Sequence, residues 1–211
     1  MAFYLEAMPA VFAAHGVSGA GMGAEIEVAM AVLRDPGPFH CLTHGDATPA
    51  NAWVSDDRVR LYDLESADWR HALIDGTFGE IRYLQSSWAF DIPAAIRAQM
   101  TAAYREALAE SIPEAGDDRL FQAGFAAASA GWLSLILLML PPVLEADYQW
   151  GQTTFRQRVV TGLERFVALE SSGQMPRLRE ACAQLSARLR DRWPAADCVL
   201  PLYPAFRDHS D

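Results

Sequence analysis

The chain has 211 residues, of which 51% are apolar and 21% charged, with a net charge of −10 at pH 7. This length suffices for one domain with a sizeable core, and the balance of residues is ordinary for a globular protein. The acidic excess argues against broad nucleic-acid binding, which needs a basic surface. All 17 basic residues are arginines, so these residues alone cannot complete a reaction that needs a lysine amine.

Three cysteines lie far apart, at positions 41, 182 and 198. This spacing favours free thiols in a reducing compartment over a disulfide framework, and we expect a cytoplasmic protein. Cys41 and His44 form a Cys-x-x-His pair, but no second ligand pair follows at zinc-site spacing. The first 16 residues have neither a basic segment nor a clean apolar stretch, and do not predict a signal peptide.

Residues 3–14 are predicted to be the end of a helix or a short helix, and residues 24–34 a second helix, joined by a glycine-rich connector at 16–23. Apolar residues including Ile26 and Leu33 recur at helical steps in the second, and a Pro-Gly-Pro run ends it. The connector contains a Gly-x-Gly-x-x-Ala, a weak match to a dinucleotide-binding fingerprint. No predicted strand precedes it, so we interpret it as a plain connector.

The only segment with strand character follows. Residues 39–43 form a short apolar stretch, and 52–54 and 59–62 are predicted strands. The polar Ser-Asp-Asp-Arg between these two strands suits a tight turn. The sequence therefore predicts an antiparallel β-hairpin shortly after a short apolar segment.

From Asp75 onward the chain is predicted to be helical. The expected helices cover residues 75–88, 92–110, 117–140, 145–170 and 175–192. The tail at 194–211 carries three prolines and is predicted to be irregular. We expect one mainly α (α+β) domain over 1–211, with a small hairpin.

Residues 120–144 carry no charge and are long enough to cross a bilayer. The segment also contains Gln122, Ser129, Ser134 and a proline pair at 141–142. These interruptions favour a buried core helix that ends near the prolines over a membrane span.

The chemically informative stretch is His-Gly-Asp-Ala-Thr-Pro-Ala-Asn, from His44 to Asn51. Asp46 and Asn51 lie five residues apart in a predicted loop, and the hairpin then returns Asp63 and Glu65 toward the same neighbourhood. Phosphoryl transfer uses one carboxylate to accept a hydroxyl proton, with an amide and another carboxylate to hold Mg²⁺.

This motif resembles the catalytic loop of aminoglycoside phosphotransferases and choline kinases, where protein kinases have His-Arg-Asp-x-x-x-x-Asn. Asp63-Leu-Glu65 resembles the Asp-x-Asp/Glu that replaces Asp-Phe-Gly in those families. The resemblance is strongest over residues 40–80 and implies the helical C-terminal lobe of a protein-kinase-like fold. It also implies transfer of a phosphate from Mg-ATP, or another nucleoside triphosphate, to a small-molecule alcohol.

The resemblance assigns a role to each matching residue. Asp46 becomes the catalytic base, and His44 holds the loop. Asn51 and Asp63 become the magnesium and cofactor ligands, and Glu65 is a weaker candidate for metal or substrate contact. Asp75 resembles the aspartate that braces the catalytic loop.

The lobe that grips the nucleotide in this family is missing from the sequence. Only 45 residues precede Asp46, whereas five strands and a helix need about 70 or more. We therefore expect negligible turnover from these residues alone, unless an N-terminal lobe is supplied in cis or in trans. The alternative is a non-catalytic binding or interaction module derived from a small-molecule kinase, with no nucleic-acid or membrane partner.

Two further points stay open at this stage. Metallophosphoesterases also use Gly-Asp and His, but they need additional clusters, and the chain has no Asp-x-His and no Gly-Asn-His. The acceptor alcohol is not specified by the sequence. Candidates for lining its pocket are Trp88, Asp91, Tyr148 and Trp150.

Overall fold

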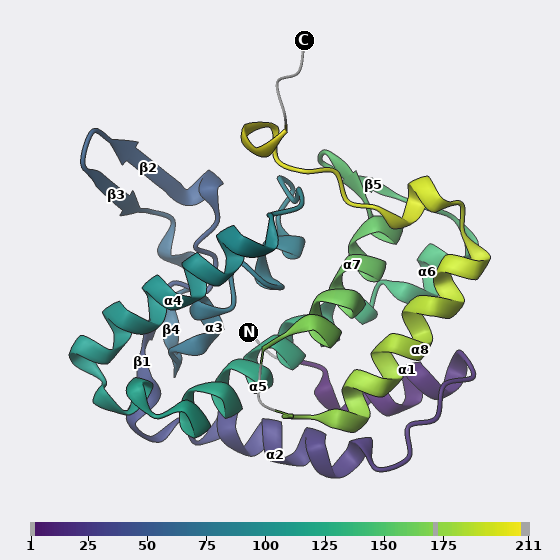
Figure 1. The fold of residues 1–211 in the computed structure, drawn as a ribbon, viewed down its shortest axis with the longest axis horizontal. Coiled ribbons are helices and arrows are strands. Elements are labelled where there is room, and N and C mark those ends of the chain that lie inside the picture. Colours follow the sequence, from purple (N-terminus) through teal and green to yellow (C-terminus); the bar gives the residue numbers. More distant parts are fainter. Residues whose placement is uncertain (1–2, 171–172, 208–211) are drawn as a thin grey trace.

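The structure is a computed structural model that describes residues 3–170 and 173–207 (Figure 1). With 62% helix and 11% strand, the chain belongs to the mainly α class, as expected. Buried apolar side chains from most of the helices form a common core. Eight α-helices are described: α1 Met8–Ala14, α2 Met22–Arg34, α3 Leu73–Gly76, α4 Ala94–Ser111, α5 Asp118–Leu137, α6 Leu140–Glu145, α7 Phe155–Ala168 and α8 Pro176–Arg192.

The strands form three separate antiparallel pairs. Within the described residues the six strands are β1 His40–Thr43, β2 Ala52–Ser55, β3 Arg58–Leu61, β4 Asp68–His71, β5 Gln149–Trp150 and β6 Thr153–Thr154. The predicted hairpin is confirmed as the β2–β3 pair, in which Val54 lies opposite Val59. The β1–β4 pair was not predicted, because β4 is a four-residue strand without clear alternation of apolar residues.

Helix α5 lies in the middle of the molecule and packs against α2, α3 and α7 (Figure 1). It begins where Asp117 accepts a hydrogen bond from the backbone N–H of Leu120 at 3.0 Å. It is long and apolar enough to cross a membrane, but 78% of its apolar stretch is buried inside the protein. The prediction of a buried helix is therefore confirmed.

The end of this helix differs from the prediction. Helix α5 ends at Leu137, and the two prolines at 141 and 142 lie in the first turn of α6 instead of ending α5. A proline is tolerated in the first helical turn because its missing N–H has no partner there in any case. The prolines thus begin a new helix.

Two other predicted helices are interrupted. The segment predicted at 75–88 contains only the short α3 and a 3-10 turn at Arg82–Gln85. The segment predicted at 145–170 begins with the β5–β6 hairpin, and α7 starts only at Phe155, after Thr154 and Gln157 form a reciprocal capping box. The capping box satisfies backbone N–H groups that a continuous helix would not leave free.

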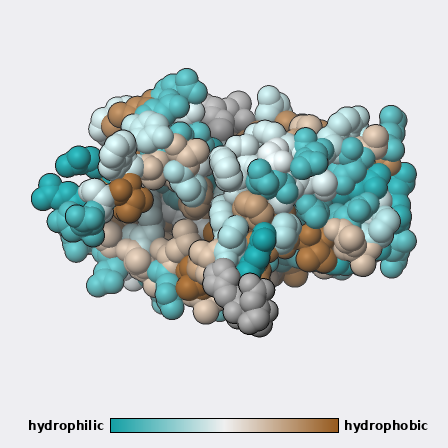
Figure 2. Space-filling model, turned by 90° about the horizontal axis from the view of Figure 1, so that it is seen from above, coloured by the Kyte–Doolittle hydropathy of each residue, from teal (hydrophilic) through white to brown (hydrophobic). Residues whose placement is uncertain are grey.

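The hairpin β2–β3 projects from the body of the molecule, at the upper left of Figure 1. Most of its side chains are exposed, including the apolar Trp53, Val54 and Val59. Seen from above, this left end carries hydrophobic residues among hydrophilic ones (Figure 2). The tail after Trp193 has two 3-10 turns within residues 194–207, and residues 208–211 of the predicted tail lie outside the described part.

Candidate functional site

The loop that carries Asp46 connects β1 to a 3-10 turn at Pro49–Asn51 and then to β2. Gly45 adopts a left-handed backbone with φ of 76°. A Cβ atom at this position would lie 2.5 Å from both the Ser66 carbonyl oxygen and Nη2 of Arg70. Both observations restrict position 45 to glycine, because an L side chain is strained there and would collide with backbone.

Asp75 braces the start of this loop. Its carboxylate accepts hydrogen bonds from the backbone N–H groups of His44, at 2.6 Å, and of Gly45, at 2.9 Å. Asp75 itself lies in α3, whose neighbours Leu73 and Ile74 are buried. These two charge-assisted hydrogen bonds tie the loop to the helical body, which is the bracing contact that the sequence analysis expected of Asp75.

The His44 imidazole links the loop to the end of the hairpin. Its Nδ1 accepts a hydrogen bond from the backbone N–H of Asp46 at 3.2 Å, and its Nε2–H donates to the Tyr62 carbonyl at 2.9 Å. The ring is buried. Because both ring nitrogens are engaged by backbone groups, His44 is arranged to hold the loop and not to exchange protons with a ligand.

Asp46 and Asn51 are in direct contact. The Asn51 side-chain NH₂ donates to the carbonyl oxygen of Asp46 and to its Oδ2, both at 2.9 Å. The Asp46 side chain remains 36% exposed. The Oδ1 atom of Asn51 accepts no hydrogen bond from residues 3–170 or 173–207, so its acceptor capacity is available to a ligand.

Asp63 comes directly after Tyr62, whose backbone ties the end of the hairpin to the loop. Tyr62 donates its backbone N–H to the Asn51 carbonyl at 3.0 Å. Asp63 has a left-handed backbone with φ of 61°, which is unusual for a residue with a side chain. Within the described residues, neither Asp63 nor Glu65 forms a side-chain hydrogen bond or ion pair, so the structure does not bring their exposed carboxylates into contact with Asp46 or Asn51.

Arg82 is a site residue that the sequence analysis missed. Its Nη2 forms an ion pair with Oδ1 of Asp46, and its guanidinium also donates to the Gly45 carbonyl at 3.3 and 3.4 Å. The guanidinium lies 4.4 Å from the centre of the Trp132 ring, and the residue is only 8% exposed. Burial lowers the pKa of Arg82, while Asp46 and Asp75 act in the opposite direction.

A signal for Arg82 was present in the sequence. It is a single charged residue among Ile81, Tyr83 and Leu84, all of which are buried. A charged residue within an apolar run is rarely buried without a partner. The expected continuous helix over 75–88 concealed its role, because the chain instead turns after α3 and directs Arg82 toward the loop.

The side-chain oxygen atoms around the loop are of the kind that Mg²⁺ prefers as ligands. Carboxylate and amide oxygens are the ligands that Mg²⁺ prefers, and it is usually held by one or two carboxylates plus phosphate oxygens and water. Asn51 Oδ1 and the Asp63 carboxylate are free acceptors of this kind. Across the described ranges, no group of three or more His, Cys, Asp or Glu side chains is placed to hold a metal ion.

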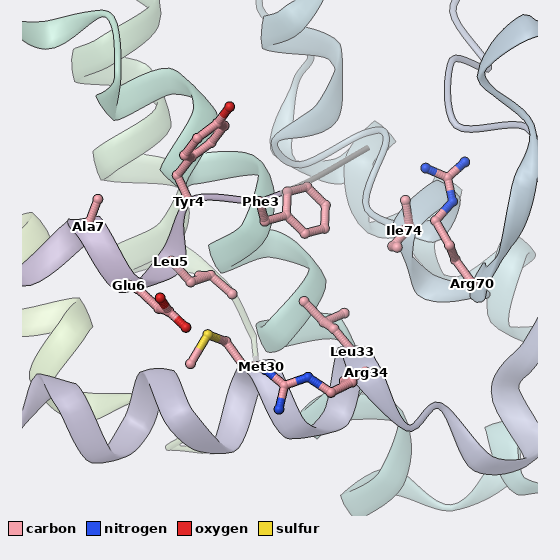
Figure 3. Close-up of a pocket in the computed structure, with 10 residues that line it drawn as sticks. All are labelled: Phe3, Tyr4, Leu5, Glu6, Ala7, Met30, Leu33, Arg34, Arg70 and Ile74. Atoms are coloured by element: carbon pink, nitrogen blue, oxygen red, sulfur yellow. The ribbon is translucent and has the colours of Figure 1, made fainter.

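A pocket of about 620 Å³ lies between the N-terminal segment and Arg70 (Figure 3). It is formed by residues 3–7, by the end of α2 and by Arg70 and Ile74, and Phe3 faces Ile74 across it. Arg70 also belongs to the support of the loop, since its Nε donates to Thr43 Oγ1 at 3.0 Å and its Nη2 to the Ser66 carbonyl at 2.6 Å. The pocket and the loop therefore share one side chain.

The four acceptor-pocket candidates have different environments. Asp91 forms an ion pair with Arg165 and accepts the backbone N–H of Ile92 at 2.9 Å, which are structural roles. Trp88 and Tyr148 are about half exposed, and Trp150 is stacked on Phe155. The backbone N–H of Gln152 donates to the Ser87 carbonyl at 3.3 Å, so the β5–β6 turn lies beside the segment that carries Trp88.

Comparison with known proteins adds no family to this description: no protein-family model and no curated protein matches the chain.

Proposed function

We propose that this chain is the catalytic lobe of an ATP-dependent phosphotransferase whose acceptor is the hydroxyl group of a small molecule. The observation that carries the proposal is the arrangement of Asp46. Its carboxylate is partly exposed and held by Asn51 and Arg82, in a loop braced by Asp75. The order of strand, loop, hairpin and Asp63 supports the same assignment, because it matches the kinase-like lobe that the motif resembles.

Each residue has a defined task in this proposal. Asp46 accepts the proton of the acceptor hydroxyl and orients that hydroxyl toward the phosphate. Asn51 and Asp63 hold Mg²⁺, which neutralises charge on the triphosphate, and Glu65 is a weaker third candidate. His44 and Asp75 keep the loop in place through backbone hydrogen bonds. Catalysis of this kind rests on positioning and electrostatic stabilisation.

The chain leaves part of this work to another segment. The sequence holds no lysine that could contact the phosphates. Large apolar side chains around the site are exposed, among them Leu42, Trp53 and Trp69. Large apolar side chains that are exposed close together often mark a contact with another segment or protein. This exposed surface supports the proposal that an N-terminal nucleotide-binding lobe is supplied in cis or in trans. Because the proposed donor is ATP, we also propose that the protein is located in the cytoplasm.

The same exposed surface is compatible with a second function, a binding or interaction module without catalysis. The two functions differ in what they require of Asp63. A phosphotransferase lobe needs the carboxylate for metal-dependent nucleotide binding, whereas an interaction module does not. The Mg²⁺ dependence of nucleotide binding therefore separates them.

The test is a calorimetric titration of the purified chain with ATP, with and without Mg²⁺. We expect weak binding that Mg²⁺ strengthens and that Asp63→Ala reduces by about tenfold or more, because the carboxylate is a direct ligand. Asp57→Ala is the matched control, since Asp57 is an exposed carboxylate at the hairpin turn. Equal effects of the two substitutions would exclude the proposed metal role.

Turnover is the second readout. We expect negligible ATP consumption by these residues alone against a panel of small alcohols. When an N-terminal lobe is supplied, turnover should appear, and Asp46→Ala should abolish it while leaving nucleotide binding nearly unchanged. Turnover that persists in Asp46→Ala would contradict the assignment of Asp46 as the base.

A further inference from the structure

The charges at the loop are unevenly distributed. Asp46, Asp63 and Glu65 all carry carboxylates in the loop and the segment after the hairpin, and Asp75 braces the loop from behind. Arg82 is buried, and its ion pair within this group of charges is with Asp46. A divalent cation attracted to this region therefore finds one carboxylate already paired with a positive charge.

We propose that Arg82 is a positioning residue that orients the Asp46 carboxylate and keeps Mg²⁺ away from it. The metal is then held by Asn51 and Asp63, and Asp46 keeps its remaining lone pairs for the hydroxyl proton instead of for the metal. This inference rests on the proposed function, because it assigns a division of labour within the same site.

The hydrogen bonds fix the orientation of the carboxylate. Oδ1 of Asp46 is paired with Arg82, and Oδ2 accepts from the Asn51 side chain at 2.9 Å. With each oxygen held by a different partner, the carboxylate cannot rotate without breaking one of them. Each oxygen keeps a second lone pair for a hydroxyl proton.

Arg82 is held independently of Asp46. Its guanidinium lies over the Trp132 ring and donates to the Gly45 carbonyl, and Trp132 is itself fixed by a hydrogen bond from Nε1 to the Ile74 carbonyl at 3.0 Å. Nη1 of Arg82 is buried and has no hydrogen-bond partner among the described residues. The chain thus keeps a cation beside Asp46 although the surroundings do not satisfy all of its donors.

The electrostatic consequence has a definite sign. A buried positive charge is screened much less than an exposed one, so Arg82 repels a divalent cation that approaches Asp46. Without Arg82, Asp46 would become an additional metal ligand together with Asn51. Removing Arg82 should therefore tighten metal binding while it destroys the free base. A residue with a merely structural role would weaken metal binding when removed.

The experiment measures Mn²⁺ affinity of the full chain by electron paramagnetic resonance, without nucleotide. For Arg82→Met we expect affinity to increase by about tenfold, as removal of a neighbouring like charge predicts. Adding Asp46→Asn to this variant should reverse the increase. Arg165→Met is the matched control, since Arg165 is also a largely buried arginine paired with an aspartate, and it should leave Mn²⁺ affinity unchanged.

A second comparison does not depend on how well Arg82→Met folds. In the otherwise unchanged chain, Asp46→Asn should alter Mn²⁺ affinity by less than about twofold, whereas Asp63→Asn should lower it about tenfold. Equal losses in these two variants would overturn the inference, as would an Arg82→Met protein with unchanged or weaker affinity. Loss of the Asp63 effect alone would instead contradict the proposed function, and absence of Mn²⁺ binding in every variant would overturn both.

Discussion

Compared with the core around α5, the loop that carries Asp46 is stabilised mainly by polar contacts. The loop is held by the Asp75 carboxylate, the His44 ring and the Arg82 guanidinium. Helix α5 is instead held by apolar burial, with 78% of its apolar stretch inside the protein. Polar contacts fix directions more than they add stability, whereas apolar burial adds stability without fixing directions. The molecule therefore separates the region that stabilises it from the region that orients the polar side chains of the loop.

The two regions meet at Trp132. This side chain belongs to α5, is nearly fully buried and contacts Phe3 edge-on with ring centres 5.3 Å apart. The guanidinium of Arg82 lies over the same ring in a cation–π contact. The core thus determines where Arg82 lies, and Arg82 in turn determines how Asp46 is oriented. We expect substitutions in the core to change global stability, and those around the loop to act locally.

The largest effect should come from truncating a core residue. Phe166 in α7 is 0% exposed, and Phe166→Ala should lower the free energy of unfolding by about 3 to 5 kcal/mol, because it removes buried contacts and leaves a cavity. Val54→Ala in the hairpin is the control. Val54 is 74% exposed, so the change should stay within about 0.5 kcal/mol. Urea unfolding measures both, and similar losses would contradict the separation of the two regions.

A pH-dependent effect of intermediate size is expected from His71 in β4. His71 is buried, stacks on Phe39 with ring centres 5.0 Å apart, and accepts the backbone N–H of Leu73 at 3.2 Å through Nδ1. Burial lowers its pKa from 6.5 to about 4. Between these values the unfolded chain binds a proton that the folded chain does not. Stability from this group is therefore full above about pH 6.5 and is lost as the pH falls toward 4, by roughly 2 to 3 kcal/mol.

The variant His71→Asn should reduce this pH dependence, because the asparagine Oδ1 can accept the same hydrogen bond but does not titrate. His40→Asn is the control, since His40 lies opposite His71 in the β1–β4 pair but is exposed. Thermal unfolding at a series of pH values gives the comparison. An unchanged slope in His71→Asn would exclude His71 as its source.

The smallest of these effects should follow from Asp75→Ala. Loss of the hydrogen bonds to the backbone of His44 and Gly45 should cost about 2 kcal/mol, because a single charged carboxylate accepts both of them. Amide hydrogen exchange should rise at positions 44 and 45 more than in α5. Asp117→Ala, which removes the N-cap of α5, is the matched control and should increase exchange in the first turn of that helix instead. Unaltered protection of the His44 and Gly45 amides would contradict the bracing role.

Much of the fold near the site could be predicted from local patterns. The β2–β3 hairpin followed from two short strands around a polar turn, and α2 followed from helical spacing of apolar residues. Helices α4 and α8 agree closely with the helices predicted at 92–110 and 175–192. The continuous helices predicted at 75–88 and 145–170 were wrong. Helical propensity is a weak guide where tertiary contacts interrupt the chain, as at the β5–β6 hairpin.

The sequence by itself determined the chemistry that is available: the His44–Asn51 motif, the later Asp63 and Glu65, and the absence of lysine. It also determined the mainly helical class, because helical periodicity is a local property. Only the tertiary structure decided how these groups are arranged. Arg82 lies 36 positions from Asp46, and the β1–β4 pair joins residues as distant in the sequence as His40 and His71. Contacts over such separations depend on the packing of the whole core around Trp132, which no local pattern encodes.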